Sequence, residues 1–160
     1  MITLQEYCEY STNASKFKEH IDEIREYNKA LIEKYPWLGS GSNSEKDYYD
    51  FTWLDDMPIG WRLAFGEQMC EELQEELERI NYVDDYVILQ VKEKFGSLRW
   101  YTGSVPRDSK LFDIVDKYEE MSEKTCIECG RPATVMSNGW ISPYCDECCE
   151  KYNIKSYVKL

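Results

Sequence analysis

The sequence predicts an α+β fold in which helices pack on a small antiparallel β-sheet, followed by a cysteine-rich element at the carboxyl end. Three segments carry apolar residues at helical spacing, which predicts amphipathic helices. Two short segments rich in β-branched and aromatic residues flank a glycine, which predicts a hairpin. Most of the cysteines follow residue 125 and set the end of the chain apart. Helices grouped around one hairpin are typical of the α+β class.

The length and charge of the chain limit what it can be. A chain of 160 residues favours one domain, or one core with a small appendage. The net charge is 19 − 31 = −12, which argues against a chain that wraps nucleic acid or lies on an anionic membrane. No apolar run approaches the roughly 18 residues of a membrane span, and the first residues lack the features of a secretion signal. We therefore expect a cytoplasmic protein.

The predicted helices cover residues 14–35, 59–80 and 108–123. The first is preceded by polar residues that can cap it and ends at Pro36, which cannot continue a helix. The second predicted helix contains Gly66 in its interior, which weakens the prediction. Its second half is crowded with glutamates, which we interpret as a solvated face: Glu71, Glu72, Glu75, Glu76 and Glu78.

The hairpin is predicted over 86–102, from strands at 86–93 and 97–102 joined by a turn that contains Gly96. Alternation along the strands places four side chains on one face, where they are candidate ligand-binding residues: Lys92, Lys94, Arg99 and Tyr101. That face would suit a phosphate or a carboxylate-rich partner. The alternative, which we favour, is that these residues pair with the acidic helices of the same chain.

The helices and the hairpin belong to a predicted core of residues 1–123. Between the first two helices, the sequence predicts a polar, Gly/Ser-rich loop over 38–46 and a short strand over 48–54. Charge is distributed unevenly along the chain. Residues 1–85 contain 8 basic and 20 acidic side chains, so this half carries 8 − 20 = −12. An acidic surface of this kind would steer toward a partner protein with a basic surface.

The cysteines predict a metal site. Seven cysteines are present, and an odd number without an export signal argues against a disulfide framework. The pairs Cys126/Cys129 and Cys145/Cys148 have CxxC spacing, and fifteen residues lie between them. Their four sulfurs can surround one ion as a tetrahedron at about 2.3 Å, which indicates a zinc site. Four protein ligands leave no position for water, so the single Zn²⁺ is expected to be structural rather than catalytic.

Two other side chains compete for a place in this site. Cys149 adjoins Cys148 and could replace it, but the spacing of Cys148 matches that of the first pair. His20 is the only histidine and could also be a ligand. We prefer a partly buried helix residue for His20, because four sulfurs already satisfy zinc. A redox pair or unligated thiols are the alternative to zinc as a whole, and the second CxxC pair argues against it.

The order of elements predicts the kind of zinc site. Gly130 follows the first pair and permits the left-handed turn of a knuckle. Asn138-Gly139 predicts a hairpin, and the second pair follows at the start of a short helix. Knuckle, hairpin and helix in this order resemble a treble-clef zinc finger, which we assign to a subdomain of residues 124–160. A zinc ribbon is the alternative. Treble clefs serve many functions, so the fold assigns none.

Several segments together resemble a family of small uncharacterised phage and prophage proteins. The family pairs a VKEKFGxLRxY segment with a carboxy-terminal CxxCG…GW…CxxC element. The matching segments here are VKEKFGSLRWY at 91–101, TCIECG at 125–130, Gly139-Trp140 and CDEC at 145–148, with Gly60-Trp61-Arg62 and Cys70 upstream. The resemblance covers about residues 58–150. It implies a phage-encoded or bacterial protein, located in the host cytoplasm if a phage encodes it, and it implies no reaction.

The sequence favours a binding protein over an enzyme. It has no GxSxG, Walker, GxGxxG or HExxH motif, and a single histidine leaves little room for His-dependent catalysis. We expect a zinc-stabilised inhibitor or adaptor of a host protein, such as a defence or nucleic-acid-processing protein, which acts through an acidic, aromatic-rich surface. The alternative is a nucleic-acid-binding zinc-finger module that uses Lys92, Lys94 and Arg99.

Overall fold

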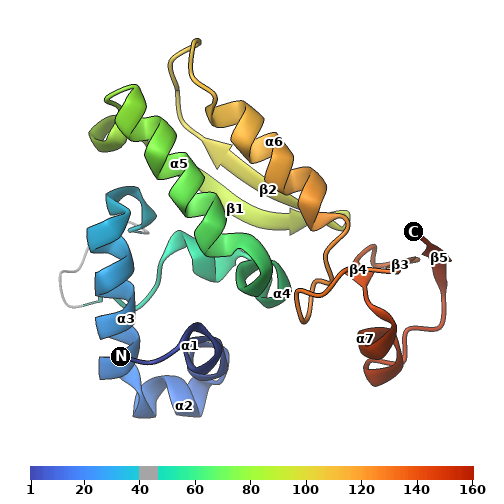
Figure 1. Ribbon diagram of the computed structural model, residues 1–160. Coiled ribbons are helices and arrows are strands. Elements are labelled where there is room, and N and C mark those ends of the chain that lie inside the picture. The colour runs from blue at the N-terminus through green and yellow to red at the C-terminus, as the bar shows by residue number, and fades with distance from the viewer. Residues whose placement is uncertain (40–46) are drawn as a thin grey trace. The chain divides into compact units, whose positions relative to one another are not determined.

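The computed structural model describes residues 1–39 and 47–160 (Figure 1). The chain forms two compact units, Met1–Asp55 and Asp56–Leu160. Helices, two small antiparallel sheets and a carboxy-terminal group of four cysteines confirm the predicted α+β class. The division predicted between residues 123 and 124 falls inside the second unit and stays a prediction. The loop predicted over 38–46 lies almost entirely outside the described residues.

The first unit is helical: α1 (Leu4–Ser11), α2 (Ala14–Glu19), α3 (Ile21–Lys34) and a 3-10 turn, η1 (Pro36–Leu38). The predicted helix 14–35 is divided at His20, which is the C-cap of α2 and the N-cap of α3. Asn13 begins α2, because its side chain accepts hydrogen bonds from the amides of Ser15 (3.0 Å) and Lys16 (3.1 Å).

Helix α1 was not predicted, although its start carries a capping box. The Glu6 amide donates to Thr3 Oγ1 (3.2 Å), and the Thr3 amide donates to the Glu6 carboxylate (2.8 Å). The strand predicted over 48–54 is wrong. The Thr52 amide donates to the Asp55 carboxylate (2.7 Å), and this local bond favours a turn over an extended strand.

A continuous helical segment opens the second unit. It consists of α4 (Ile59–Trp61), a π-helical segment η3 (Arg62–Gly66) and α5 (Glu67–Arg79). The predicted helix 59–80 is therefore confirmed in extent, and its π-helical part ends at Gly66. After the 3-10 turn η4, the chain continues through the predicted hairpin and third helix: η4 (Val83–Asp85), β1 (Ile88–Lys94), β2 (Ser97–Thr102) and α6 (Leu111–Ser122).

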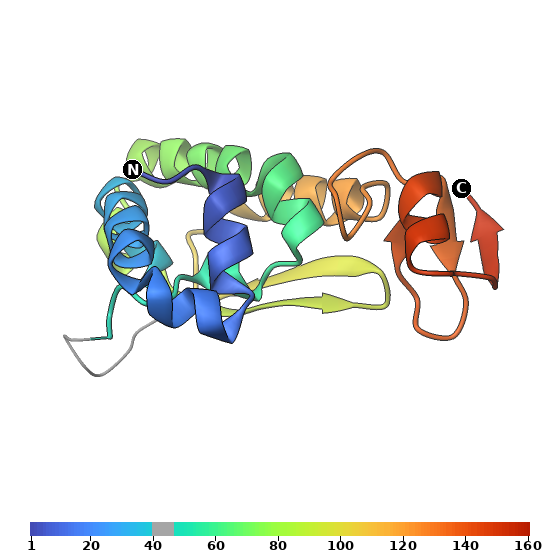
Figure 2. The same cartoon turned by 90° about the horizontal axis from the view of Figure 1, so that it is seen from below.

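Helices α5 and α6 lie side by side on one face of the β1–β2 hairpin (Figures 1 and 2). The core between them is apolar and fully or almost fully buried: Leu73, Leu77, Leu98, Trp100, Leu111 and Tyr118. Each such side chain contributes about 1.5–3 kcal/mol through burial. Many aromatic rings are therefore part of the core, and the aromatic-rich surface expected from composition is smaller than the residue count suggested.

Side chains of α6 form hydrogen bonds with the outer edge of β2. Lys92 lies opposite Arg99 and Val91 opposite Trp100, in the predicted antiparallel arrangement. The amides of Leu98 and Trp100 point away from β1, and each donates to a side chain of α6: Leu98 to Ser122 Oγ (2.8 Å) and Trp100 to Glu119 Oε1 (3.2 Å). These bonds satisfy the outer edge of β2 and fix α6 against the sheet.

The glutamates of α5 do not form one solvated face. Glu71, Glu75 and Glu78 are exposed, whereas Glu72 and Glu76 are turned to α6 and its start. The Glu72 carboxylate accepts from Tyr118 Oη (2.7 Å) and pairs with Lys117. Glu76 is buried and accepts from the Arg79 side chain (2.6 and 2.8 Å) and from the Lys110 amide (2.7 Å). The prediction is thus wrong for these two residues, because a run of like charges does not reveal the helix phase.

Glu76 gives the fold a measurable dependence on acid. Its pKa falls from 4.5 to about 2, chiefly because Arg79 donates to the carboxylate and because the Lys110 amide also does. Since the folded pKa is depressed, the stabilisation is complete above about pH 4.5 and is lost as the pH falls toward 2. We expect Glu76→Gln to lower the free energy of unfolding at pH 7 by about 1–3 kcal/mol.

The difference between wild type and Glu76→Gln should shrink as the pH is lowered through this window, as measured by urea unfolding at each pH. Glu75→Gln is the matched control, because Glu75 is exposed one residue away. A difference that stays constant from pH 7 to pH 2.5 would contradict the role given to the Glu76 carboxylate.

The carboxy-terminal part of the second unit contains β3 (Val135–Ser137), β4 (Pro143–Tyr144), α7 (Asp146–Lys151) and β5 (Tyr157–Lys159). Strand β3 is central and pairs antiparallel with both β4 and β5. The hairpin predicted at Asn138-Gly139 is present, and Gly139 adopts φ +78 in the loop between β3 and β4. Strand β5 was not predicted.

Candidate metal centre

The first two cysteines lie on a knuckle that comes before β3. The Cys126 amide donates to the Arg131 carbonyl (2.7 Å), and the Gly130 amide donates to the Cys126 carbonyl (3.0 Å), which closes the turn. Gly130 has φ +79, a left-handed conformation that glycine adopts without steric cost. The knuckle is joined to the hairpin because the Ile127 amide donates to the Pro143 carbonyl of β4 (2.9 Å).

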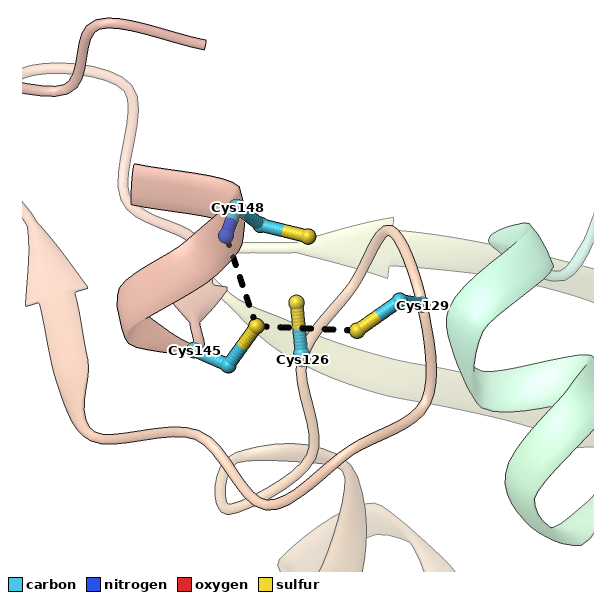
Figure 3. Close-up of side chains that lie close together, drawn as sticks. All are labelled: Cys126, Cys129, Cys145 and Cys148. Carbon is cyan, nitrogen blue, oxygen red and sulfur yellow. Dashed lines mark hydrogen bonds between the residues drawn. The ribbon is translucent and has the colours of Figure 1, made fainter. Parts of the chain in front are cut away.

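The second pair comes from the start of α7. Cys145 is the N-cap of this helix, and its Sγ accepts a hydrogen bond from the Cys148 amide (3.5 Å). The sulfurs of Cys126, Cys129, Cys145 and Cys148 all lie within 4.8 Å of one another and face a common space (Figure 3). Cys129 Sγ and Cys145 Sγ are 3.6 Å apart. A tetrahedron of sulfurs about 2.3 Å from one ion has edges of about 3.8 Å, so the arrangement fits a single bound metal ion.

The donor set and its surroundings suit a thiolate-bound cation. Cys126, Cys145 and Cys148 are buried, and burial raises the pKa of Cys126 and Cys148. For Cys129, burial acts in the same direction, but hydrogen bonds from Arg131 and from neighbouring groups outweigh it and lower the pKa to about 6. Among the common biological cations, zinc is the one that favours a site of four sulfur ligands without oxygen.

Arg131 offsets part of the charge of the site. Four thiolates and one divalent ion sum to −2, and the Arg131 Nε lies 3.3 Å from Cys129 Sγ. The same guanidinium pairs with Glu147 of α7 at 2.6 Å. Arg131 therefore links the knuckle to the helix that carries the second cysteine pair. Nothing in the sequence pattern singled out this residue, although its position two residues after Cys129 was visible.

The knuckle is packed against α4 through two glycines. The Gly60 amide donates to the Ile127 carbonyl (2.9 Å), and a Cβ added at Gly60 would lie 2.2 Å from the Cys126 carbonyl oxygen. A Cβ added at Gly130 would lie 2.5 Å from the Gly60 carbonyl oxygen. Next to them, the buried Trp61 Nε1 donates to the Thr125 carbonyl (3.0 Å). Only glycine permits this approach of the two backbones.

Cys149 and His20, which compete with the four cysteines as metal ligands in the sequence, lie outside the group of four sulfurs. Cys149 lies outside the group of four sulfurs and lines a hollow beside Val135 and Tyr157. His20 belongs to the first unit, where its ring stacks on Tyr10 with centroids 3.9 Å apart. Within residues 1–39 and 47–160, no other group of three or more His, Cys, Asp or Glu side chains is arranged to hold a metal ion.

The candidate ligand-binding residues of the hairpin are only partly free. Lys92 lies opposite Arg99, and its Nζ is 5.6 Å above the Tyr101 ring. Lys94 is exposed near the turn. Arg99 is half-buried, donates to Ser97 Oγ (2.9 Å) and lies 3.8 Å from Glu119. Arg99 therefore follows the expected intramolecular pairing, whereas the two lysines remain available to a partner.

The fold and the four-sulfur site define an α+β protein with a treble-clef-like metal-binding element. No family model, curated protein or solved structure matches the chain. The resemblance to phage and prophage proteins therefore stays a prediction. Among the described residues, no helix is long and apolar enough to cross a membrane.

Proposed function

We propose that the chain is a non-enzymatic binding protein whose carboxy-terminal element is held together by one structural Zn²⁺. The group of four sulfurs carries this proposal, because four protein ligands fill a tetrahedral site and leave no position for water or substrate. The residues that would hold the ion are Cys126, Cys129, Cys145 and Cys148. When bound, zinc would supply a cross-link between knuckle and helix rather than a Lewis acid.

The partner is a protein of the host cell, which this chain would inhibit or recruit as an adaptor after expression from a phage or prophage. The phage setting rests on the resemblance of residues 91–101 and 125–148. Exposed Glu71, Glu75 and Glu78 on α5 support a partner with a basic surface, such as a nucleic-acid-processing or defence protein. Glu72 and Glu76 are turned to α6 and its start, so they are not part of the acidic contact surface.

Nucleic-acid binding through the hairpin is the less supported function. It would need Lys92, Lys94 and Arg99 on one accessible face, and Arg99 is held by Ser97 and Glu119. Two lysines on a chain of net charge −12 supply little counterion release.

Charge reversal on α5 tests the acidic contact. We expect Glu71→Lys/Glu75→Lys to slow association with the captured host protein about tenfold at low salt, because steering by opposite charges sets the association rate. The partner is first recovered from bacterial lysate by affinity capture and mass spectrometry, and rates are then measured by surface plasmon resonance at two salt concentrations.

Glu26→Lys/Glu33→Lys is the matched control, because it changes net charge equally at two exposed positions of α3. Equal slowing by both variants would show that net charge, and not the α5 surface, steers the encounter. Repeated captures that return no specific host protein would contradict the proposed function itself.

A further inference from the structure

An apolar pocket lies where the tips of two hairpins meet in the second unit. Its volume is about 230 Å³, and it is lined by the β1–β2 tip and the β3–β4 loop: Glu93, Lys94, Phe95, Gly139, Trp140 and Ile141. The two tips are packed together, because the site of a Gly96 Cβ would lie 2.9 Å from Met136 Sδ and 3.2 Å from Ile141 Cγ2. The pocket is therefore formed by two braced elements rather than by one loose loop.

The aromatic residues of this pocket are exposed to an unusual degree. Trp140 is 81% exposed and Phe95 is 70% exposed. Large exposed rings beside a pocket are the usual anchors of binding surfaces.

Phe95 also occupies a strained position. It adopts φ 55 and is followed by Gly96 at φ 79, so both central residues of the turn are left-handed, as in a type I′ turn. Asn-Gly is the favoured pair for such a turn, and a bulky residue at the first position is rare. A large, exposed side chain that is kept at a position of backbone strain points to a role outside the fold.

Strand β1 offers one accessible outward-pointing amide, that of Glu93, beside this pocket, whereas Val91 is buried. Leu98 and Trp100 direct their amides outward to α6, so their cross-strand neighbours Glu93 and Val91 direct theirs outward from β1. Among the described residues, the Glu93 amide donates to no other group, so it is the position of this edge that a partner can reach. An outward backbone amide next to an apolar pocket can hold the backbone of an extended peptide at the end of the strand.

The charge beside the edge selects the occupant. Lys92 and Lys94 outnumber the single carboxylate of β1, that of Glu93, which accepts a hydrogen bond from the Gly96 amide (2.7 Å). We propose that the end of β1 at Glu93 and Lys94 and the adjoining Phe95–Trp140 pocket bind an extended segment of a partner protein. That segment carries carboxylates next to Lys92 and Lys94 and inserts one large apolar side chain between the two rings. This inference rests on the proposed protein-binding function. It adds a second binding surface, which prefers an acidic partner segment, whereas the α5 surface prefers a basic one.

Short random peptides, presented by ribosome display, are selected for binding to the zinc-loaded full chain. The affinities of the enriched peptides are then measured. We expect an enriched motif of acidic residues around one large apolar residue. Trp140→Ser and Lys92→Glu/Lys94→Glu should each weaken binding about 10-fold to 100-fold. Methylation of the peptide amide that faces Glu93 should weaken binding, whereas methylation of the neighbouring amides should not.

Phe95→Asn separates a binding role from a folding role. Asparagine suits the left-handed turn better than phenylalanine, so Tm should rise by roughly 2–4 °C while peptide affinity falls about tenfold or more. A variant that is destabilised, or more stable with unchanged affinity, would overturn the role given to Phe95. Enrichment of basic peptides, or of peptides that bind Trp140→Ser equally well, would overturn the proposed surface.

A nucleic-acid occupant is distinguished in the same assay. Oligo(dT) is added as a competitor of the enriched peptides. If it displaces them at lower concentrations than free peptide does, the occupant of this surface is single-stranded nucleic acid and not a peptide. Glu71→Lys/Glu75→Lys should leave peptide binding unchanged, so the proposals for the α5 surface and for the Phe95–Trp140 pocket are tested independently. A captured host protein that binds Phe95→Asn/Trp140→Ser normally would leave the proposed function intact and remove this surface.

Discussion

Removal of the metal is expected to unfold the carboxy-terminal element around residues 124–160. The buried cluster at its centre consists of Cys126, Cys145 and Cys148, with Cys129 and Tyr144 packed against it, and Val135 is the one buried branched aliphatic side chain between residues 124 and 160. Binding of structural zinc to zinc-finger peptides is worth about 10–16 kcal/mol, which is far more than a marginally stable element can lose.

Hydrogen exchange detected by mass spectrometry measures this loss by segment. After chelation, rapid exchange is expected at the amides that join knuckle and hairpin, such as Ile127 and Thr134, which donate to Pro143 and Tyr144 (both 2.9 Å). The hairpin amides of β1 and β2 should retain more protection. Unchanged protection of residues 124–160 in metal-free protein would show that the element folds without an ion.

Two adjacent cysteines provide the matched control for this prediction. Cys148→Ser should release the metal and reproduce the exchange pattern of the chelated protein, whereas Cys149→Ser should retain both metal and protection, because Cys149 lies outside the group of sulfurs. The opposite result would move the fourth ligand by one residue.

Alanine at Gly130 is expected to have the second largest effect. A left-handed backbone costs a non-glycine residue about 1–2 kcal/mol, and overlap of the new Cβ with the Gly60 carbonyl, 2.5 Å away, adds about 1–3 kcal/mol. Denaturant unfolding of the zinc-loaded protein measures the sum. Gly60→Ala should also be strongly destabilising, because its Cβ would meet the backbone of Cys126 and Ile127 within 2.6 Å.

Gly139→Ala is the control for Gly130→Ala. Gly139 has nearly the same φ, +78 against +79, but no heavy atom lies within 4 Å of the position that an added Cβ would take. It should therefore lose only the conformational part, about 1–2 kcal/mol. Equal losses for the two variants would show that contact between the knuckle and α4 contributes nothing to stability.

Local patterns were sufficient to predict much of this fold. The hairpin, α6 and the spacing of the cysteines each depend on residues close in sequence, and each was found close to its predicted position. The capping box of Thr3 and Glu6 would have revealed α1 by the same reasoning. The false strand at 48–54 arose because aromatic content outweighed the turn-forming bond between Thr52 and Asp55.

Long-range contacts account for what the sequence did not reveal. The approach of Gly60 to Gly130 joins residues 70 positions apart, and neither glycine differs from a turn glycine in a one-dimensional pattern. The burial of Glu76 depends on the position of Lys110 at the start of α6. The pocket between Phe95 and Trp140 exists only because two hairpin tips meet, so neither residue was identified beforehand as part of a site.

The central claim is that four thiolates hold one structural zinc ion. X-ray absorption at the zinc edge, combined with elemental analysis of the purified chain, tests it most directly. We expect one zinc per chain, surrounded by four sulfurs at about 2.3 Å. A substoichiometric metal content after reconstitution, or a shell that contains nitrogen or oxygen in place of a sulfur, would contradict the account.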